Sequence, residues 1–151
     1  MKSLETQIVI AASPSEVWAV LLDFAAYPQW NPFLVSVKGE AKTGAYLDNT
    51  IKNGKGKDMR FQPEVLVVDT EREFRWKGKL WVKGLFDGEH YFKLEATEAG
   101  HTLLTHGEHF SGLLSGVLMK MIGEDTRMGF EAMNQALKAR VEQVKEVGHV
   151  A

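Results

Sequence analysis

The sequence of 151 residues predicts a single α+β domain, residues 1–151, in which one curved antiparallel sheet packs against a long C-terminal helix. Three observations predict this class. A β-branched stretch and a short amphipathic segment come first, a meander of strand patterns and tight turns occupies the middle, and a proline-free segment with helical spacing comes last. We count about seven strand patterns. With all helices on one face, the sheet must curl around the long helix to bury both apolar faces.

The first strand and the first helix are predicted by residue type and by capping chemistry. The stretch TQIVIA, residues 6–11, is rich in β-branched residues that favour strands. Ser13 is a good helix N-cap, Pro14 suits the first helical position, and Glu16 stands three residues after the cap, as in a capping box. The apolar residues that follow recur at helical spacing: Val17, Val20, Leu21 and Phe24.

The stretch DFAAYPQWNPFL, residues 23–34, concentrates aromatic residues between two chain breakers. Pro28 and Pro32 prevent the preceding helix from continuing through it. The stretch is too short to form a core of its own, so its aromatic side chains must pack against elements from elsewhere in the chain. These side chains are Tyr27, Trp30 and Phe33.

The middle of the chain, Phe33 to Ser111, alternates strand patterns with turn signals. Asn53-Gly54 is a hairpin signal, and residues 58–69, DMRFQPEVLVVD, predict one longer strand in which Pro63 marks an edge or a bulge. From Leu113 to about Val147 the chain contains no proline and predicts one long helix. Its roughly helical stripe consists of Val117, Met121, Gly129, Met133, Leu137, Val141 and Val144.

Strand alternation places a carboxylate opposite an imidazole on the concave face of the sheet. In the strand HYFKLEAT, residues 90–97, Lys93 and Glu95 belong in water, so the intervening residues face inward. If Glu98-Ala99-Gly100 form a three-residue hairpin loop, these inward residues pair with inward residues of the last strand. The expected pairs are Leu94 with Leu104, Phe92 with His106, and His90 with Glu108.

Four stretches that cover nearly the whole chain carry a family resemblance: SPSEVWAVLLDFAAYPQWNPF, GLFDGEHYF, LLTHGEHFSGLL and TRMGFEAMNQALKARVE. In this order they resemble the START-like superfamily and, within it, the bacterial polyketide cyclase/dehydrase-like group; the birch-pollen-allergen-like proteins are more distant relatives. The resemblance implies the helix-grip fold, a curved seven-stranded antiparallel sheet wrapped around a long C-terminal helix, with short helices after the first strand and a cavity between sheet and helix. It implies no single function, because the superfamily supports many.

The implied cavity assigns places to the aromatic residues. In such a fold the stretch 23–34 closes one side of the cavity, and the loop from Gly84 to Gly88 borders its mouth, where two large apolar residues are candidates for a gate. The positions of Leu104 and Phe110 match inward apolar positions of the family. The expected ligand-binding residues are Tyr27, Trp30, Phe33, Asn49, Phe61, Phe74, Trp76, Leu85, Phe86, His90, Phe92, His106, Glu108, Phe110, Met121, Met133 and Leu137.

His90, His106 and Glu108 are the candidate catalytic residues. A buried unpaired carboxylate is unfavourable, so an inward Glu108 needs a partner. A structural hydrogen-bonded pair, a polar anchor for a ligand and an acid/base pair all satisfy this condition. The sequence indicates no metal site and no cofactor, since at most three ligands converge, no cysteine is present and no glycine-rich phosphate loop opens a helix.

Composition and charge argue against a nucleic-acid-binding, secreted or membrane-spanning protein. The formal net charge is −2 with no long run of one sign, which gives no indication of a nucleic-acid partner. The longest apolar stretch near the N-terminus, Ile8 to Ala12, is too short for a signal peptide, and no run approaches the roughly 20 apolar residues of a spanning helix. We therefore expect a cytoplasmic protein without stable membrane insertion; its oligomeric state stays open.

Three functions are compatible with these observations. The mainly apolar inner face favours a carrier or sensor that binds a small hydrophobic molecule, lipid-, polyketide- or aromatic-like, in the internal cavity. The His/Glu cluster is also compatible with a cyclase or dehydratase that acts on a polyketide-like substrate. The third alternative is a protein-interaction module with a filled core, in which Leu85 and Phe86 contact a partner.

Overall fold

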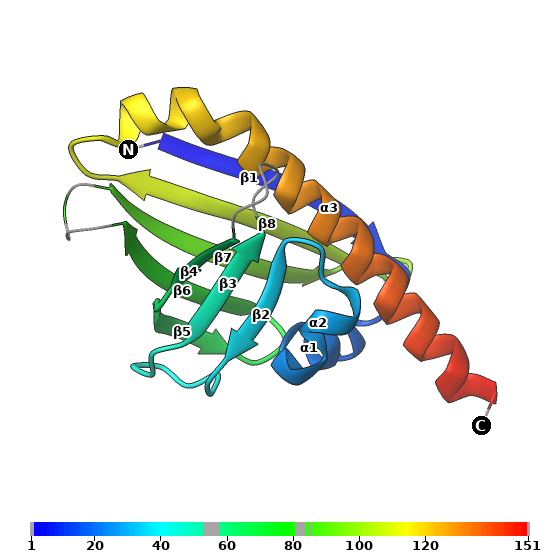
Figure 1. The fold of residues 1–151 in the computed structure, drawn as a ribbon. Helices are drawn as coiled ribbons and strands as arrows, with labels where there is room; N and C mark the ends of the chain where they lie inside the picture. Colours follow the sequence, from blue (N-terminus) through cyan, green and yellow to red (C-terminus); the bar gives the residue numbers. More distant parts are fainter. Residues whose placement is uncertain (1, 53–57, 81–83, 85, 151) are drawn as a thin grey trace.

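The strands and helices follow the predicted order along the chain (Figure 1). The computed structural model describes residues 2–52, 58–80, 84 and 86–150; for residues 80, 86 and 148–150 it describes the backbone only. The elements are β1 (Lys2–Ile10), α1 (Pro14–Leu21), η1 (Phe24–Ala26), α2 (Tyr27–Trp30), β2 (Leu34–Lys38), β3 (Asp48–Lys52), β4 (Asp58–Phe61), β5 (Glu64–Asp69), β6 (Glu73–Leu80), β7 (Phe86–Ala96), β8 (Thr102–Ser111) and α3 (Ser115–Val150).

The described strands form two sheets rather than the single seven-stranded sheet that we expected. One sheet has five strands in the order β1-β8-β7-β6-β5, and the other has three in the order β2-β3-β4. All neighbouring strands are antiparallel. The long helix α3 packs along β1 and also contacts α1 (Figure 1). The α+β helix-grip class is therefore confirmed, although the strand count within one sheet was wrong.

The division into two sheets has its origin at Pro63. The long strand predicted for residues 58–69 breaks there into β4 and β5. Because proline has no N–H to donate, a hydrogen-bonded ladder cannot continue through it. The Pro63 carbonyl instead accepts a hydrogen bond from the Leu47 N–H at 2.9 Å, and Tyr46 and Glu64 form an isolated bridge. The chain thereby passes from the small sheet to the edge of the large one.

The predicted capping box at α1 is confirmed. The Ser13 hydroxyl accepts a hydrogen bond from the Glu16 N–H, and the Glu16 carboxylate accepts one from the Ser13 N–H. After α1 the chain makes one 3₁₀ turn and the short helix α2, with Pro28 in the first turn, where its missing N–H removes no helical bond. The Tyr27 hydroxyl donates to the Leu21 carbonyl, which ties α2 to the end of α1.

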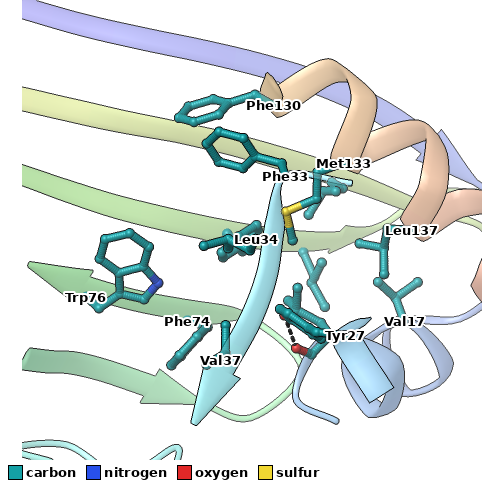
Figure 2. Close-up of a cluster of buried hydrophobic side chains, with 14 of the residues drawn as sticks. Val17, Tyr27, Phe33, Leu34, Val37, Phe74, Trp76, Phe130, Met133 and Leu137 are labelled. Carbon is teal, nitrogen blue, oxygen red and sulfur yellow. Dashed lines mark hydrogen bonds between the residues drawn. The ribbon is translucent and has the colours of Figure 1, made fainter. Parts of the chain in front are cut away.

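The hydrophobic core lies between the five-stranded sheet, β2 and the middle of α3 (Figure 2). Phe33 joins these layers, because its ring packs directly on the backbone of α3: a Cβ at Gly129 would meet the Phe33 ring at 2.5 Å. The same ring packs edge-on against Phe130, with centroids 5.5 Å apart. The buried side chains labelled in Figure 2 are Val17, Tyr27, Phe33, Leu34, Val37, Phe74, Trp76, Phe130, Met133 and Leu137.

The predicted apolar stripe of α3 is buried over only part of its length. Met133, Leu137 and Val141 are buried. The predicted placement of Met121 in the cavity wall is wrong, because its side chain is 70% exposed. Helical periodicity identifies the apolar face of a helix, but it does not say how far along the helix another element covers that face. Other stripe members that are exposed are Val117 and Val144.

Candidate functional site

The concave face of the large sheet has the predicted register. Between β7 and β8, Leu94 pairs with Leu104, Phe92 with His106, and His90 with Glu108, so all three expected pairs are confirmed. On the other side of β7, Phe74 pairs with Phe92 and Trp76 pairs with His90. Two neighbouring rows across β6, β7 and β8 therefore carry ring side chains and one carboxyl group: Phe74, Phe92 and His106 in one, and Trp76, His90 and Glu108 in the other.

Most of the expected ligand-binding residues lie in the interior between the sheets and α3, a region that we call the interior below. The buried ones are Tyr27, Phe33, Asn49, Phe74, Trp76, His90, Phe92, His106, Phe110, Met133 and Leu137. Trp30, Phe61 and Glu108 are partly buried. Met121 lies outside, as described above. Leu85 and the side chain of Phe86, the predicted gate, lie outside the described residues.

The two histidines form a direct pair at the centre of the interior. Their Nε2 atoms are 2.7 Å apart, and both rings are buried. His90 stacks on the Trp76 ring, with centroids 4.3 Å apart. His106 stacks between Phe92 and Phe130, with centroid distances of 4.3 and 4.2 Å. The aromatic rings thus fix the plane of each imidazole, and the hydrogen bond between the rings fixes which edges meet.

The second nitrogen of His106 has a partner that sequence analysis missed. His106 Nδ1 lies 2.8 Å from Asn134 Oδ1, on α3. Asn134 Nδ2 donates to Thr6 Oγ1 on β1 at 2.8 Å, and the Thr6 hydroxyl donates to the His106 carbonyl at 2.8 Å. The sequence does contain a signal for this partner: Asn134 follows Met133 of the apolar α3 stripe and lies one helical turn after Phe130, so it was a candidate for an inward polar residue.

Burial determines the charge state of the cluster. His90 Nδ1 lies 3.4 Å from Glu108 Oε1. Burial raises the pKa of Glu108 to about 8 and lowers the pKa of His90 to about 3. Burial and the neighbouring His90 lower the pKa of His106 well below its usual 6.5, and the hydrogen bond to Asn134 opposes this only in part. At neutral pH the cluster therefore consists of a protonated carboxyl group and two neutral imidazoles.

A glycine makes room for the Glu108 carboxyl group. Gly88 stands on β7 opposite Phe110, one inward position beyond His90. A Cβ at Gly88 would collide with the Glu108 carboxyl group, whose side chain therefore lies across the bare backbone. The Glu108 side chain keeps 14% of its surface exposed. The Glu108 side chain thus lies beside the buried His90 and reaches the surface of the molecule.

Several buried polar atoms of the described residues have no hydrogen-bond partner. The most unusual is the Asn49 side chain, which is fully buried with both its oxygen and its nitrogen unpaired. An unpaired buried polar group costs about 1–3 kcal/mol, so native structures contain few of them, and each requires an explanation. The full set is Trp30 Nε1, Asn31 Nδ2, Asn49 Nδ2 and Oδ1, and His90 Nδ1.

The predicted wall residues pack against one another in this structure. Phe61 packs on Trp76 with centroids 5.4 Å apart, and Phe24 packs on Phe74 at 5.8 Å. Two surface depressions have volumes of about 550 and 570 Å³, and the aromatic wall residues line neither of them. These ring contacts would have to open for a molecule to lie between the paired side chains.

The described residues contain neither a group of metal-ligating side chains nor a membrane-spanning helix. Among these residues no three His, Asp or Glu side chains gather in a way that could hold a metal ion. The helices described here include none that is long and apolar enough to cross a bilayer.

The described elements have the helix-grip architecture, in which antiparallel strands pack against the long helix α3. Residues 1–142 match the model of the family described as polyketide cyclase/dehydrase and lipid transport, and the chain belongs to this family. No curated protein matches the sequence.

Solved structures share this fold at low sequence identity. A START superfamily protein from Mycobacterium smegmatis is 22% identical, with a TM-score of 0.72 over 94% of this chain and 98% of that chain. The Zhui aromatase/cyclase from Streptomyces sp. R1128 is 16% identical, with a TM-score of 0.75 over 94% of each chain. The protein TTHA0849 from Thermus thermophilus is 18% identical, with a TM-score of 0.74 over 95% of this chain and 99% of that chain.

Proposed function

We propose that this protein binds a small hydrophobic molecule, of lipid, polyketide or aromatic type, in the interior between the sheets and α3, as a carrier or sensor. The observation that carries the proposal is the set of unpaired polar atoms in an otherwise apolar interior, above all the Asn49 amide and His90 Nδ1. Family membership supports it, because the family description includes lipid transport.

The energetic argument concerns the free protein and the complex. Each unpaired buried group destabilises the free protein by about 1–3 kcal/mol. A ligand oxygen that pairs with such a group recovers this free energy only in the complex, while the ligand's apolar surface gains about 25 cal/mol per Å² from burial. An apolar pocket with a few oriented polar groups is the usual composition of a small-molecule site.

Two segments are candidates for the entrance. Phe33 closes the interior against α3, where it is held by contact with Gly129 and Phe130. The predicted gate of Leu85 and Phe86 follows Gly84, whose N–H donates to the Asp87 carboxylate at 3.2–3.3 Å. We expect Phe86→Ala to speed ligand release more than it changes the free energy of unfolding. Phe33→Ala should speed release as well, but it should also lower the free energy of unfolding by about 3–5 kcal/mol, because the Phe33 ring is buried in the core.

Binding can be tested with Nile red, a neutral dye whose fluorescence rises in apolar surroundings. We expect saturable enhancement with 1:1 stoichiometry and competition by a subset of a panel of lipids, flavonoids and polyketides. Met121→Glu is the matched control, because it places a charge on an exposed part of α3 and should leave the isotherm unchanged. Failure of every panel member to compete, or loss of the dye signal in Met121→Glu, would refute binding in the interior.

Acid/base catalysis of a cyclisation or dehydration is the second candidate. It is favoured by one observation, the neutral carboxyl group of Glu108 beside the neutral imidazole of His90. In a dehydration, His90 would take a proton from carbon while Glu108 protonates the departing hydroxyl, so that a C–H and a C–O bond break, a C=C bond forms and water leaves. Under this alternative, Glu108→Gln abolishes turnover of a β-hydroxyketone substrate and leaves its binding intact.

A further inference from the structure

The hydrogen bonds around the two histidines form a chain whose direction can be deduced. The chain starts at the His106 backbone carbonyl, which can only accept. The Thr6 hydroxyl donates its single hydrogen to that carbonyl. Thr6 Oγ1 is then left as an acceptor, so Asn134 must turn its Nδ2 toward Thr6 and its Oδ1 toward His106.

The same logic fixes the tautomer of each imidazole. Because Asn134 Oδ1 can only accept, His106 must carry its proton on Nδ1 and present a bare Nε2. The contact of 2.7 Å between the two Nε2 atoms then requires His90 to donate from Nε2. A neutral His90 with its proton on Nε2 has a bare lone pair on Nδ1, the atom that lacks a hydrogen-bond partner among the described residues.

The surroundings of His90 Nδ1 define what could bind it. Glu108 Oε1 lies 3.4 Å from this atom, which is too long for a good hydrogen bond. Trp76, Phe92 and Phe130 surround the rest of the His90 ring at centroid distances of 4.3, 5.0 and 5.0 Å. A group that satisfies Nδ1 must therefore donate a proton, bring an apolar body that packs against aromatic rings, and enter from the side of Glu108.

We infer that the interior selects hydrophobic ligands that carry a hydroxyl donor, such as a phenol or an enol, and that this hydroxyl donates to His90 Nδ1 beside Glu108. The inference rests on the proposed binding function and specifies its ligand class. A carboxylate of the same size is disfavoured, because it offers only lone pairs to the bare nitrogen and would be buried without a counter-charge. An ether of the same size has no proton to donate.

The direction of the chain can be tested on the wild-type protein without any ligand. Long-range ¹H–¹⁵N correlation spectra of histidine side chains distinguish the two neutral tautomers. At neutral pH we expect His106 protonated on Nδ1 and His90 protonated on Nε2. His101, His109 and His149 are assigned from single variants, and His90 is distinguished from His106 by its short proton–proton distances to Trp76. The opposite tautomer at either ring, or a doubly protonated His90, would remove the basis of the inference.

Ligand class is tested with three naphthalene probes that differ only in one substituent: 2-naphthol, 2-methoxynaphthalene and 2-naphthoate. We expect 2-naphthol to bind about tenfold more tightly than either of the others, the difference made by one buried hydrogen bond. In His90→Phe, which keeps an aromatic ring, the affinities for 2-naphthol and 2-methoxynaphthalene should converge, while 2-naphthoate should stay weak because its charge is still buried without a counter-charge. If that variant does not fold, the wild-type series and the tautomer measurement still decide.

The outcomes distinguish failure of the hydroxyl inference from failure of the proposed hydrophobic binding. Equal affinities for the three probes in the wild-type protein, or tighter binding of 2-naphthoate, would overturn the hydroxyl inference and leave hydrophobic binding in place. If Nile red and all three probes fail to bind, the proposed function and the inference fall together.

Discussion

The two histidines of the interior are equally buried and lie in neighbouring rows of the sheet, yet their surroundings differ. We call His106, Asn134 and Thr6 the closed end of the cluster, because both nitrogens of the His106 ring have partners: Nδ1 pairs with Asn134 and Nε2 with His90. We call His90 and Glu108 the open end, because within the described part of the chain His90 Nδ1 has none. Burial alone therefore does not identify a functional histidine; the count of partners around each ring does.

The largest expected loss of stability follows a substitution beside the closed end. Phe130 is fully buried and stacks on His106 with centroids 4.2 Å apart. Phe130→Ala should lower the free energy of unfolding by about 3–5 kcal/mol, because it leaves a cavity beside a ring that it orients. Urea denaturation measures the change. Met128→Ala, at a position 60% exposed on the same helix, is the control and should have little effect. A loss below about 1 kcal/mol for Phe130→Ala would show that this region is loosely packed.

A smaller loss of stability is expected when His106 Nδ1 is left without its hydrogen-bond partner. Asn134→Ala removes the acceptor of His106 Nδ1 and the donor to Thr6. The unpaired N–H that remains, together with the lost hydrogen bonds, should cost about 3 kcal/mol. The adjacent, exposed Gln135 supplies the control Gln135→Ala. Unchanged stability in Asn134→Ala would mean that the deduced chain does not operate.

The pH dependence of stability should distinguish the buried histidines from the buried carboxyl group of Glu108. The pKa of His90 is lowered from 6.5 to about 3 on folding, so the unfolded chain binds more protons below pH 6.5 and stability falls as the pH drops; His106 acts in the same direction. The pKa of Glu108 is raised from 4.5 to about 8, so the folded protein binds more protons between these values and stability falls as the pH rises toward 8. Below pH 6.5 the effect of the two histidines on stability is larger than that of the single carboxyl group. These three groups therefore predict that the free energy of unfolding is largest near pH 6.5.

The Glu108→Gln variant isolates the carboxyl contribution. It should remove the loss of stability between pH 6.5 and 8, which we expect to be on the order of 1–2 kcal/mol in the wild-type protein. Below pH 4.5 the variant should be nearly as stable as the wild type, because the carboxyl group is then neutral in both the folded and the unfolded state. At pH 6.5 it should already be more stable, since the wild-type carboxyl group is ionised in the unfolded chain but neutral in the folded protein. Thermal or urea unfolding at four pH values measures both effects. A wild-type profile that is flat from pH 6.5 to 8 contradicts the raised pKa of Glu108.

The smallest effect is expected on the exposed part of α3. Met121→Ala should change the free energy of unfolding by no more than about 0.5 kcal/mol, because the side chain is 70% exposed. Met133→Ala, on the buried part of the same helix, should cost about 2–5 kcal/mol. Comparable losses for the two variants would mean that a second chain covers Met121 in solution.

The sequence predicted the open end of the cluster well. Lys93 and Glu95 must face water, and this requirement alone sets the phase of β7 and, through the short hairpin, the pairing of His90 with Glu108. Local patterns decide such features, because the residues involved lie close together in the chain.

The closed end could not be predicted in the same way. Asn134 and Thr6 are 128 positions apart, and their contact depends on where α3 crosses β1. The error at Met121 has the same origin, since periodicity gives the face of a helix and not the extent of its cover. At Pro63 the sequence carried the correct signal for a break, but the division into two sheets depends on the bridge between Tyr46 and Glu64.

The central claim, that ligands bind in the interior, is tested most directly by methionine methyl NMR. Met133 is buried at the core face of α3, whereas Met121 and Met128 are exposed on the same helix. With ¹³C-methyl methionine and 2-naphthol as the probe, we predict that ring currents shift the Met133 methyl resonance along a saturable isotherm while those of Met121 and Met128 stay in place. Shifts confined to Met121 and Met128, with Met133 unchanged, would place the ligand on the exposed surface of α3 and contradict the account.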